Sequence, residues 1–148
     1  MVAAAHSRKK SLGYGFVLDC SVTMAWLFED ESSAETDKIL ENLRAFSAVV
    51  PSIWPLEVAN VLLMAQRKKR ITTSQASNFI DALTILPIVV DETTSVRAMH
   101  SIFRLAENLH ISIYDAAYLE LALREKIPLA TLDKELIVAT HRAGHTHI

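Results

Sequence analysis

The chain has 148 residues, with 15 lysines and arginines against 17 aspartates and glutamates, and a formal net charge of −2. This length suits one compact domain, and the charge lacks the basic excess that nucleic-acid-binding domains usually carry. Charged residues interrupt every apolar run well before the roughly 20 residues that a membrane helix needs. We therefore expect a soluble protein without a membrane partner, and the single cysteine, Cys20, excludes an internal disulfide.

The amino-terminal segment, residues 1–15, is small, polar and basic without periodicity. This pattern predicts a flexible tail, followed by one domain over residues 16–148. The tail has no apolar stretch of the kind that forms the core of a secretory signal. We therefore expect the protein to be cytoplasmic.

The first predicted element of the domain is the apolar run Phe16–Cys20, which has the continuous hydrophobicity of a strand buried on both faces of a parallel sheet. Helical sequence follows over residues 22–28. The sequence then predicts, in chain order, a helix over 33–46, a strand over 48–50, helices over 55–70 and 73–86, a strand over 88–90, helices over 94–109 and 114–124, a strand over 129–132, a helix over 134–142 and a candidate edge strand over 145–148. Strands that alternate with helices predict right-handed crossovers, and the helices outweigh the strands. The expected fold class is α/β, a helix-rich three-layer α/β/α sandwich with a short central parallel sheet.

Four acidic residues fall at positions that such a sheet brings together. Asp19 ends the first strand, Asp133 follows the fourth, and Glu57 and Asp115 each lie in the first turn of a helix. In an open parallel sheet the carboxyl ends of the strands share one rim, where ligands bind. The four carboxylates, although far apart in sequence, can therefore converge on one site.

Taken singly, three of these acids have a structural explanation, because an acid in a first helical turn is favoured by roughly 0.3 to 2 kcal/mol through capping and the helix dipole. Asp19 is different: so apolar a strand has little reason to end in an acid followed by Ser21 and Thr23 unless that acid faces a cation or a reacting group. Clustered carboxylates repel one another unless a divalent cation joins them. Ligands that are all oxygens favour Mg²⁺ or Mn²⁺ over zinc.

Other reactive residue types have simpler interpretations. His141, His145 and His147 lie in a polar terminal segment without a cysteine, which favours a structural role over a zinc site. The basic run over residues 67–70 is most simply a solvated helix end. Cys20 beside Asp19 is interpreted as a small buried hydrophobic residue rather than a reactive thiol.

Four segments, FVLDCS, PSIWPLEVANVL, SIYDAAYLELA and LATLDKEL, together resemble the motifs of PIN domains, specifically the toxin ribonucleases of VapC type from toxin–antitoxin pairs. The resemblance covers nearly the whole chain after the basic tail, which such toxins usually lack. It places in the site the acids Asp19, Glu57, Asp115 and Asp133 and, beside them, Ser21, Asn60 and Thr131.

The resemblance implies an endoribonuclease that hydrolyses RNA phosphodiester bonds with one or two Mg²⁺ or Mn²⁺ ions. It also implies a cognate antitoxin that silences the enzyme, and a homodimer. The four carboxylates would be catalytic residues and metal ligands, while Ser21, Asn60 and Thr131 would orient carboxylates or waters. Such a mechanism does not use the 2′-hydroxyl, so it does not by itself restrict the enzyme to RNA.

Two enzyme classes with a similar first strand are excluded. Phosphatases of the haloacid dehalogenase type need a second aspartate where Ser21 stands, and receiver domains need an acidic pair and a strand-end lysine that we do not find. The alternatives that stay open are a PIN-like module that binds RNA or a protein without cutting, and a nuclease that acts on DNA or in RNA processing. Trp26 and Phe28 are most simply core aromatics, but if exposed they would suit an antitoxin that fills the acidic groove.

Overall fold

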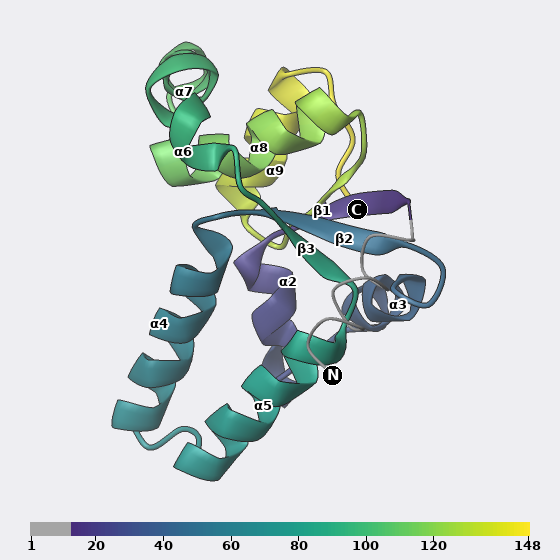
Figure 1. The fold of residues 1–148 in the computed structure, drawn as a ribbon, viewed down its shortest axis with the longest axis vertical. Coiled ribbons are helices and arrows are strands. Elements are labelled where there is room, and N and C mark those ends of the chain that lie inside the picture. Colours follow the sequence, from purple (N-terminus) through teal and green to yellow (C-terminus); the bar gives the residue numbers. More distant parts are fainter. Residues whose placement is uncertain (1–12) are drawn as a thin grey trace.

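The computed structural model describes residues 13–148, and a single parallel sheet runs through the middle of this region (Figure 1). The strand order is β3-β2-β1-β4, and every neighbouring pair is parallel. The strands are β1 (Tyr14–Leu18), β2 (Ser47–Pro51), β3 (Ile88–Asp91) and β4 (Leu129–Ala130). Because all strands point the same way, their carboxyl ends meet at one edge of the sheet.

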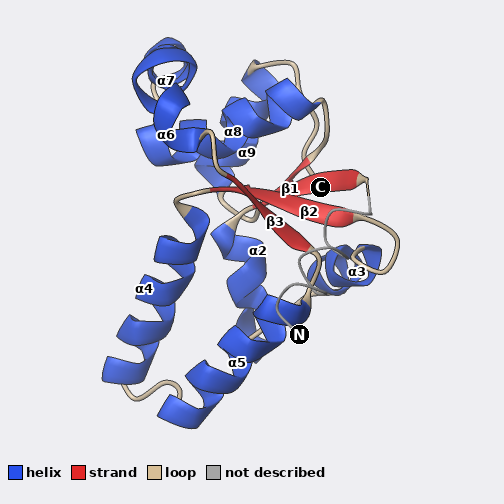
Figure 2. Ribbon diagram, in the orientation of Figure 1, coloured by secondary structure: helices blue, strands red, loops and turns tan. Residues whose placement is uncertain are grey.

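Helices cover both faces of the sheet (Figure 2). Helices α2 to α5 lie on one face and α6 to α9 on the other, which gives three layers (Figure 1). The predicted helix-rich three-layer α/β/α fold is therefore confirmed. The helical elements are α2 (Cys20–Ala25), the 3₁₀ turn η1 (Glu29–Glu31), α3 (Ala34–Asn42), α4 (Trp54–Arg67), α5 (Thr73–Ile85), α6 (Thr94–Arg97), the π-helical turn η2 (Ala98–Ile102), α7 (Phe103–Leu109), α8 (Ile113–Glu125) and α9 (Lys134–Arg142).

The core lies where α8 crosses the two inner strands. All five residues of β2 are buried, as are the last three of β1, which explains why both strands are continuous apolar runs. Residues 116–122 of α8 are all buried, and all but Glu120 and Tyr118 are purely apolar, so the middle of this helix is not amphipathic. Across residues 13–148, every helix is too short or too polar to cross a bilayer.

Several element boundaries differ from the predicted ones. Strand β1 begins at Tyr14, two residues early, and the chain already turns into α2 at Cys20; the rest of the predicted tail, residues 1–12, lies outside the described residues. The helix predicted over 94–109 is interrupted by η2, whose wider turn leaves no mark in the hydrophobic pattern. The predicted edge strand is reduced to one parallel bridge, between Leu129 and His147.

Candidate active site

Asp19 stands directly after β1 and is only 7% exposed. It occupies the position before the first residue of α2, where an aspartate commonly accepts a hydrogen bond from the helix, yet its side chain makes no such capping bond. Instead, the Ser21 and Thr131 hydroxyls donate to its Oδ2 atom, over 2.6 and 2.8 Å. The carboxylate is therefore held in a fixed orientation by two side-chain hydroxyls, one from α2 and one from the residue after β4.

The same two hydroxyls fasten the loop after β4 to the end of β1. The Leu132 N–H donates to Ser21 Oγ over 3.0 Å, and the Asp133 N–H donates to Thr131 Oγ1 over the same distance. Each hydroxyl thus donates to Asp19 and accepts from the β4 loop. This arrangement links Asp19 to the segment that carries Asp133.

Glu57 and Asp115 approach from helices on opposite faces of the sheet. Glu57 lies in the first turn of α4, and the Tyr118 hydroxyl donates to its Oε1 atom over 2.7 Å. Asp115 lies in the first turn of α8, one turn before Tyr118. Tyr118 was not predicted as a site residue, although a tyrosine inside so apolar a helix needs a partner for its hydroxyl, and that was the available signal.

Asp133 and Asn60 are the most exposed of the predicted site residues. Asp133 is exposed, and its Oδ1 atom accepts a hydrogen bond from the Leu136 N–H over 3.0 Å. It therefore caps α9, which is the structural role expected for this acid taken singly. Asn60, one turn after Glu57, is exposed. Asp133 reaches the other acids through its charge, as the pKa shifts of two of them show.

Burial and mutual repulsion raise the pKa of three of the four acids. Burial is the largest cause of the raised pKa of Asp19; hydrogen bonds from Ser21, Thr131 and the Cys20 backbone lower it in part, and the Asp133 charge raises it further. The pKa of Glu57 is raised by burial and by the charges of Asp19 and Asp115, against the Tyr118 hydrogen bond.

Asp115 is affected by three neighbouring acids. Burial, followed by the charges of Asp133, Asp19 and Glu135, raises its pKa from 3.8 to about 6. Each of the four predicted acids thus either raises the pKa of another member of the set or has its own pKa raised by one, and we call the set the carboxylate cluster (Asp19, Glu57, Asp115 and Asp133).

The chemistry of the carboxylate cluster fits a divalent cation, but its side chains are not closed around one. Across the described part of the chain, none of the four acids forms an ion pair with lysine, arginine or histidine. Uncompensated carboxylates with raised pKa values are the donor set that Mg²⁺ or Mn²⁺ relieves of repulsion. Yet between residues 13 and 148 no three His, Cys, Asp or Glu side chains lie close enough to hold one ion.

The three carboxy-terminal histidines fasten the end of the chain. His141 Nε2 and His147 Nδ1 lie 2.8 Å apart, and His145 Nε2 lies 2.6 Å from the Ile127 carbonyl oxygen.

Cys20 is buried, and this burial, with the Glu57 and Asp19 charges, raises its thiol pKa to about 12. A thiol with so high a pKa is a poor nucleophile.

The two aromatic residues considered for an antitoxin groove pack inside the protein. Phe28 is 5% exposed, and the Arg70 guanidinium lies 3.7 Å above its ring. Trp26 is half-buried and donates its indole N–H to the Thr36 carbonyl over 2.9 Å. Arg70, part of the basic run, also pairs with Asp30 at 2.6 Å, so this end of α4 is engaged within the chain.

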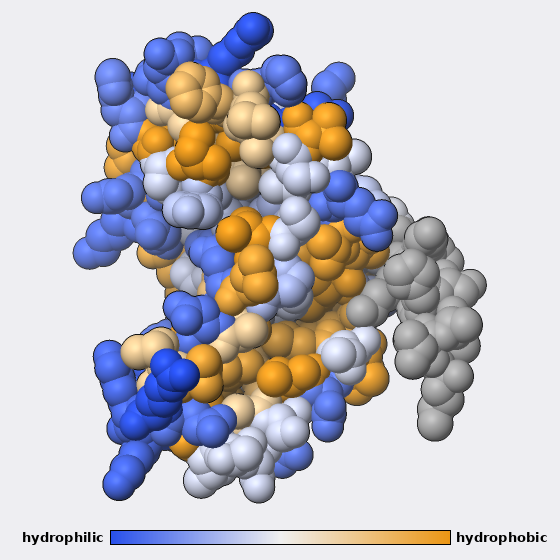
Figure 3. Space-filling model, turned by 60° about the vertical axis from the view of Figure 1, so that its left-hand side comes forward, coloured by the Kyte–Doolittle hydropathy of each residue, from blue (hydrophilic) through white to orange (hydrophobic). Residues whose placement is uncertain are grey.

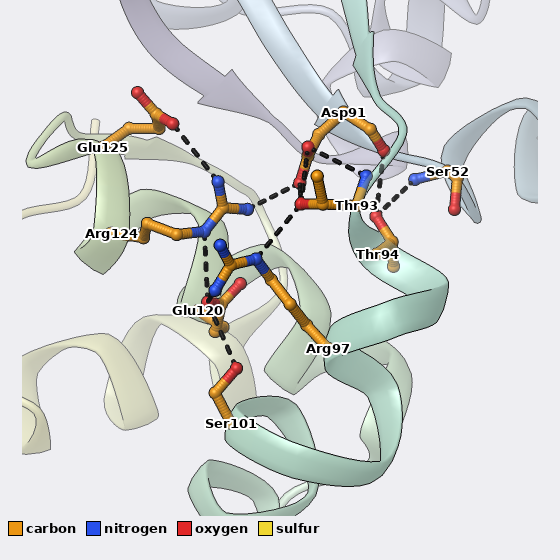
Figure 4. A network of polar contacts seen from close by, with 9 residues as sticks. All are labelled: Ser52, Asp91, Thr93, Thr94, Arg97, Ser101, Glu120, Arg124 and Glu125. Carbon is orange, nitrogen blue, oxygen red and sulfur yellow. Dashed lines mark hydrogen bonds and ion pairs between the residues drawn. The ribbon is translucent and has the colours of Figure 1, made fainter.

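A second group of charged residues, not predicted from the sequence, links β3, α6 and α8 (Figure 4). Arg124 contacts Asp91 over 2.6 Å and Glu120 over 3.2 Å. Arg97 contacts the same Glu120 oxygen over 3.5 Å. We call Asp91, Arg97, Glu120 and Arg124 the arginine network; its one signal in the sequence is Glu120, an acid within the apolar run of α8.

Comparison with known proteins places the chain by family and by fold. A family model described as PIN domain matches residues 16–141. Among solved structures, the crystal structure of PAE2754 from Pyrobaculum aerophilum superimposes with a TM-score of 0.62 at 22% identity, covering 86% of this chain and 79% of the other. No curated protein sequence matches the chain.

Proposed function

The chain belongs to the PIN-domain family, whose members are typically nucleases that use divalent metal ions, and from this premise we propose that it is a metal-dependent endoribonuclease acting at the carboxylate cluster. The observation that carries the proposal is the state of Asp19. This carboxylate is buried, caps no helix, receives two hydroxyls and has no cation partner among the described residues. A group kept in that state at a strand end is suited to a ligand.

In this proposal the carboxylates of the cluster hold one or two Mg²⁺ or Mn²⁺ ions. A divalent cation bound there lowers the pKa of a water and offsets the charge of an RNA phosphodiester as it is hydrolysed. Ser21 and Thr131 keep Asp19 in place, and Tyr118 orients Glu57. Asn60 is exposed and free to orient a water or a phosphate oxygen.

We further propose that the protein is a toxin of VapC type, active in the cytoplasm and silenced by a cognate antitoxin. The four motifs support this role, and so does an apolar face suited to protein partners. In Figure 3 hydrophobic side chains gather on the face that carries α4. The exposed apolar residues of α4 include Leu56 (69%) and Leu63 (42%), and those of η2 and α7, across the sheet, are Met99 (84%) and Phe103 (53%).

A second copy of the chain is the partner that we propose for this apolar face, because exposed apolar side chains that gather on one face mark association. Met99 and Phe103 lie four residues apart on adjoining helical turns and so share one side. Light scattering should then give twice the monomer mass, and Met99→Lys should yield a monomer that still cleaves RNA. A wild-type monomer at high concentration would contradict the homodimer and leave the nuclease proposal intact.

The experiment that tests the nuclease is cleavage of total RNA by purified wild type and Asp19→Asn, with and without added Mn²⁺. We expect cutting only by wild type with metal, while circular dichroism shows both proteins folded. Equal cutting by both proteins would point to a contaminant. No cutting by a folded, metal-loaded wild type that still binds RNA would favour the second candidate, a PIN module that binds RNA or a protein without cutting, which the open arrangement of the acids supports.

A further inference from the structure

A second hollow lies outside the carboxylate cluster, on the helices that follow β3. It encloses about 520 Å³ and is lined by Thr93, Val96, Arg97, His100, Ser101 and Arg104. Three of these side chains are basic, two carry hydroxyls and none is acidic. We call it the basic pocket; its lining of cations and hydroxyl donors is the chemistry that recognises phosphate.

Arg97 is held in the basic pocket before any ligand arrives. Its Nε donates to Thr93 Oγ1 over 3.1 Å, and its Nη1 lies 3.5 Å from Glu120 Oε1 (Figure 4). Glu120 is itself anchored by Arg124 over 3.2 Å and by the Ser101 hydroxyl over 3.4 Å. An arginine fixed in this way loses little side-chain freedom when it binds a phosphate with its remaining N–H groups.

His100 and Arg104 have no such engagement. Within residues 13–148 neither side chain forms a hydrogen bond or an ion pair, in contrast to Arg70, Arg97 and Arg124. The π-helical turn η2 lies between Arg97 and Arg104, and such turns are rare and often occur at functional sites. The basic pocket thus has uncompensated donors on a locally distorted helix.

The basic pocket and the carboxylate cluster are joined by α8. Asp115 of the cluster and Glu120, which holds Arg97, are five residues apart on this helix, a rise of about 7.5 Å. Both sites also start from the same edge of the sheet, where β3 leads into α6 and β2 into α4 (Figure 1). The two sites therefore share one helix and one edge of the sheet, which is the placement that a single extended substrate contacting both would need.

We propose that Arg97, His100 and Arg104 form a phosphate-binding subsite for the single-stranded RNA substrate, engaging the backbone a few nucleotides away from the bond that is cut. RNA as the ligand rests on the proposed nuclease function. The subsite also answers the objection raised by the net charge of −2, because binding then depends on a local set of cations and not on an overall basic excess.

The test is binding of a fluorescein-labelled, single-stranded oligouridylate to the full chain in EDTA, followed by anisotropy over a series of salt concentrations. Arg104→Gln should weaken binding roughly five- to tenfold and reduce the slope of log affinity against log salt by about 0.7, the value for one phosphate contact on a single strand. The matched control is Arg44→Gln, which removes the same charge from an exposed arginine in the turn between α3 and β2. This control should change neither quantity.

Three outcomes would overturn the subsite: wild type that does not bind the oligouridylate, equal effects of Arg104→Gln and Arg44→Gln, or an Arg104→Gln effect on poly-glutamate alone, which would indicate an acidic protein partner. Because binding is measured without metal, the result is independent of cleavage. If the protein cuts RNA but Arg104→Gln leaves oligouridylate binding unchanged, the subsite is wrong and the nuclease proposal stands. If Arg104→Gln weakens binding but the protein never cuts RNA, the subsite stands and the nuclease proposal is wrong.

Discussion

Two groups of acids lie against or on α8, and the pKa values of Asp91 in one group and Asp115 in the other shift in opposite directions. In the arginine network, burial raises the pKa of Asp91, but hydrogen bonds from the Thr93 backbone and from Arg124 outweigh it and leave the pKa below its ordinary value. In the carboxylate cluster, burial raises the pKa of Asp115 and neighbouring acids raise it further. The network carries its own cations, whereas the cluster has none.

This difference separates acids that are paired within the fold from acids that are not. Buried acids that serve only the fold are paired, because an unpaired buried charge is costly. A cluster left unpaired destabilises the protein and persists where a ligand from outside supplies the charge. The acids of the arginine network have arginines beside them, whereas the proposed function would supply the carboxylate cluster with the cation that it lacks among residues 13–148.

The largest expected effect is on cleavage, and it should separate the two groups. We expect Asp115→Asn to lower the rate of RNA cleavage by about 10³-fold, a loss of about 4 kcal/mol in transition-state stabilisation, because a charged ligand is removed. Asp91→Asn, the same chemical change in the arginine network, should stay within about threefold of wild type. Initial rates at saturating RNA and Mn²⁺ measure both; similar losses in the two variants would erase the distinction.

The next effect is on stability without metal, and here the two groups should differ in sign. Glu120→Ala leaves Arg97 and Arg124 without their shared partner and should cost about 3 kcal/mol of unfolding free energy. Asp115→Asn removes a repelled charge and should add about 1 kcal/mol once solvent screening of this half-exposed group is included. Urea titrations in EDTA measure the unfolding free energies of both variants. If the two variants change this free energy in the same direction, the proposed difference between the two groups of acids is wrong.

The carboxylate cluster could be predicted from the sequence and the arginine network could not, and the difference has a physical reason. The four acids could be placed on one rim because each follows a predicted strand or opens a predicted helix, so backbone topology alone brings them together. The arginine network depends instead on side-chain contacts over long separations. Asp91 and Arg124, 33 residues apart, lie at the ends of elements whose relative packing the hydrophobic pattern does not specify.

The same limit applies inside the carboxylate cluster. The sequence placed Asp19 at a strand end and Ser21 and Thr131 beside it, but it could not show that Asp19 caps no helix or that Tyr118 bonds Glu57. Both are matters of side-chain orientation. Strand ends were also approximate: β4 stops at Ala130, and the next residue, Thr131, donates its hydroxyl to Asp19.

A smaller effect should reveal how Glu57 is held. Tyr118→Phe removes the hydroxyl that bonds Glu57 Oε1, and we expect about tenfold more Mn²⁺ to be needed for half-maximal cleavage, as for other residues that orient metal ligands. The rate at saturating Mn²⁺ should change little. Tyr114→Phe, on the same helix but 61% exposed, is the matched control. An unchanged Mn²⁺ requirement in Tyr118→Phe would mean that Glu57 needs no such support.

The smallest effect is the pH dependence of stability in EDTA, where the two groups should again oppose each other. Because the pKa of Asp115 is about 6 in the folded protein against an ordinary value of 3.8, the folded state takes up its proton first as the pH falls. Its repulsion is therefore relieved, and stability from this group rises by about 1 kcal/mol from pH ~7 to ~4. Asp91, whose folded pKa is lowered, stabilises the protein above its unfolded pKa and loses that contribution as the pH falls further.

Unfolding free energies of wild type, Asp115→Asn and Asp91→Asn from urea titrations between pH ~2 and ~8 measure both contributions, because the Asp91 contribution is lost only below its unfolded pKa. Asp115→Asn should flatten the rise toward low pH, because asparagine takes up no proton there. Asp91→Asn should lower stability most at neutral pH and least in acid. Saturating Mn²⁺ should reverse the wild-type slope above pH ~6, since the cation then binds the ionised cluster and competes with protons. If Mn²⁺ shifts Asp115→Asn as much as wild type, the cation binds somewhere other than the carboxylate cluster.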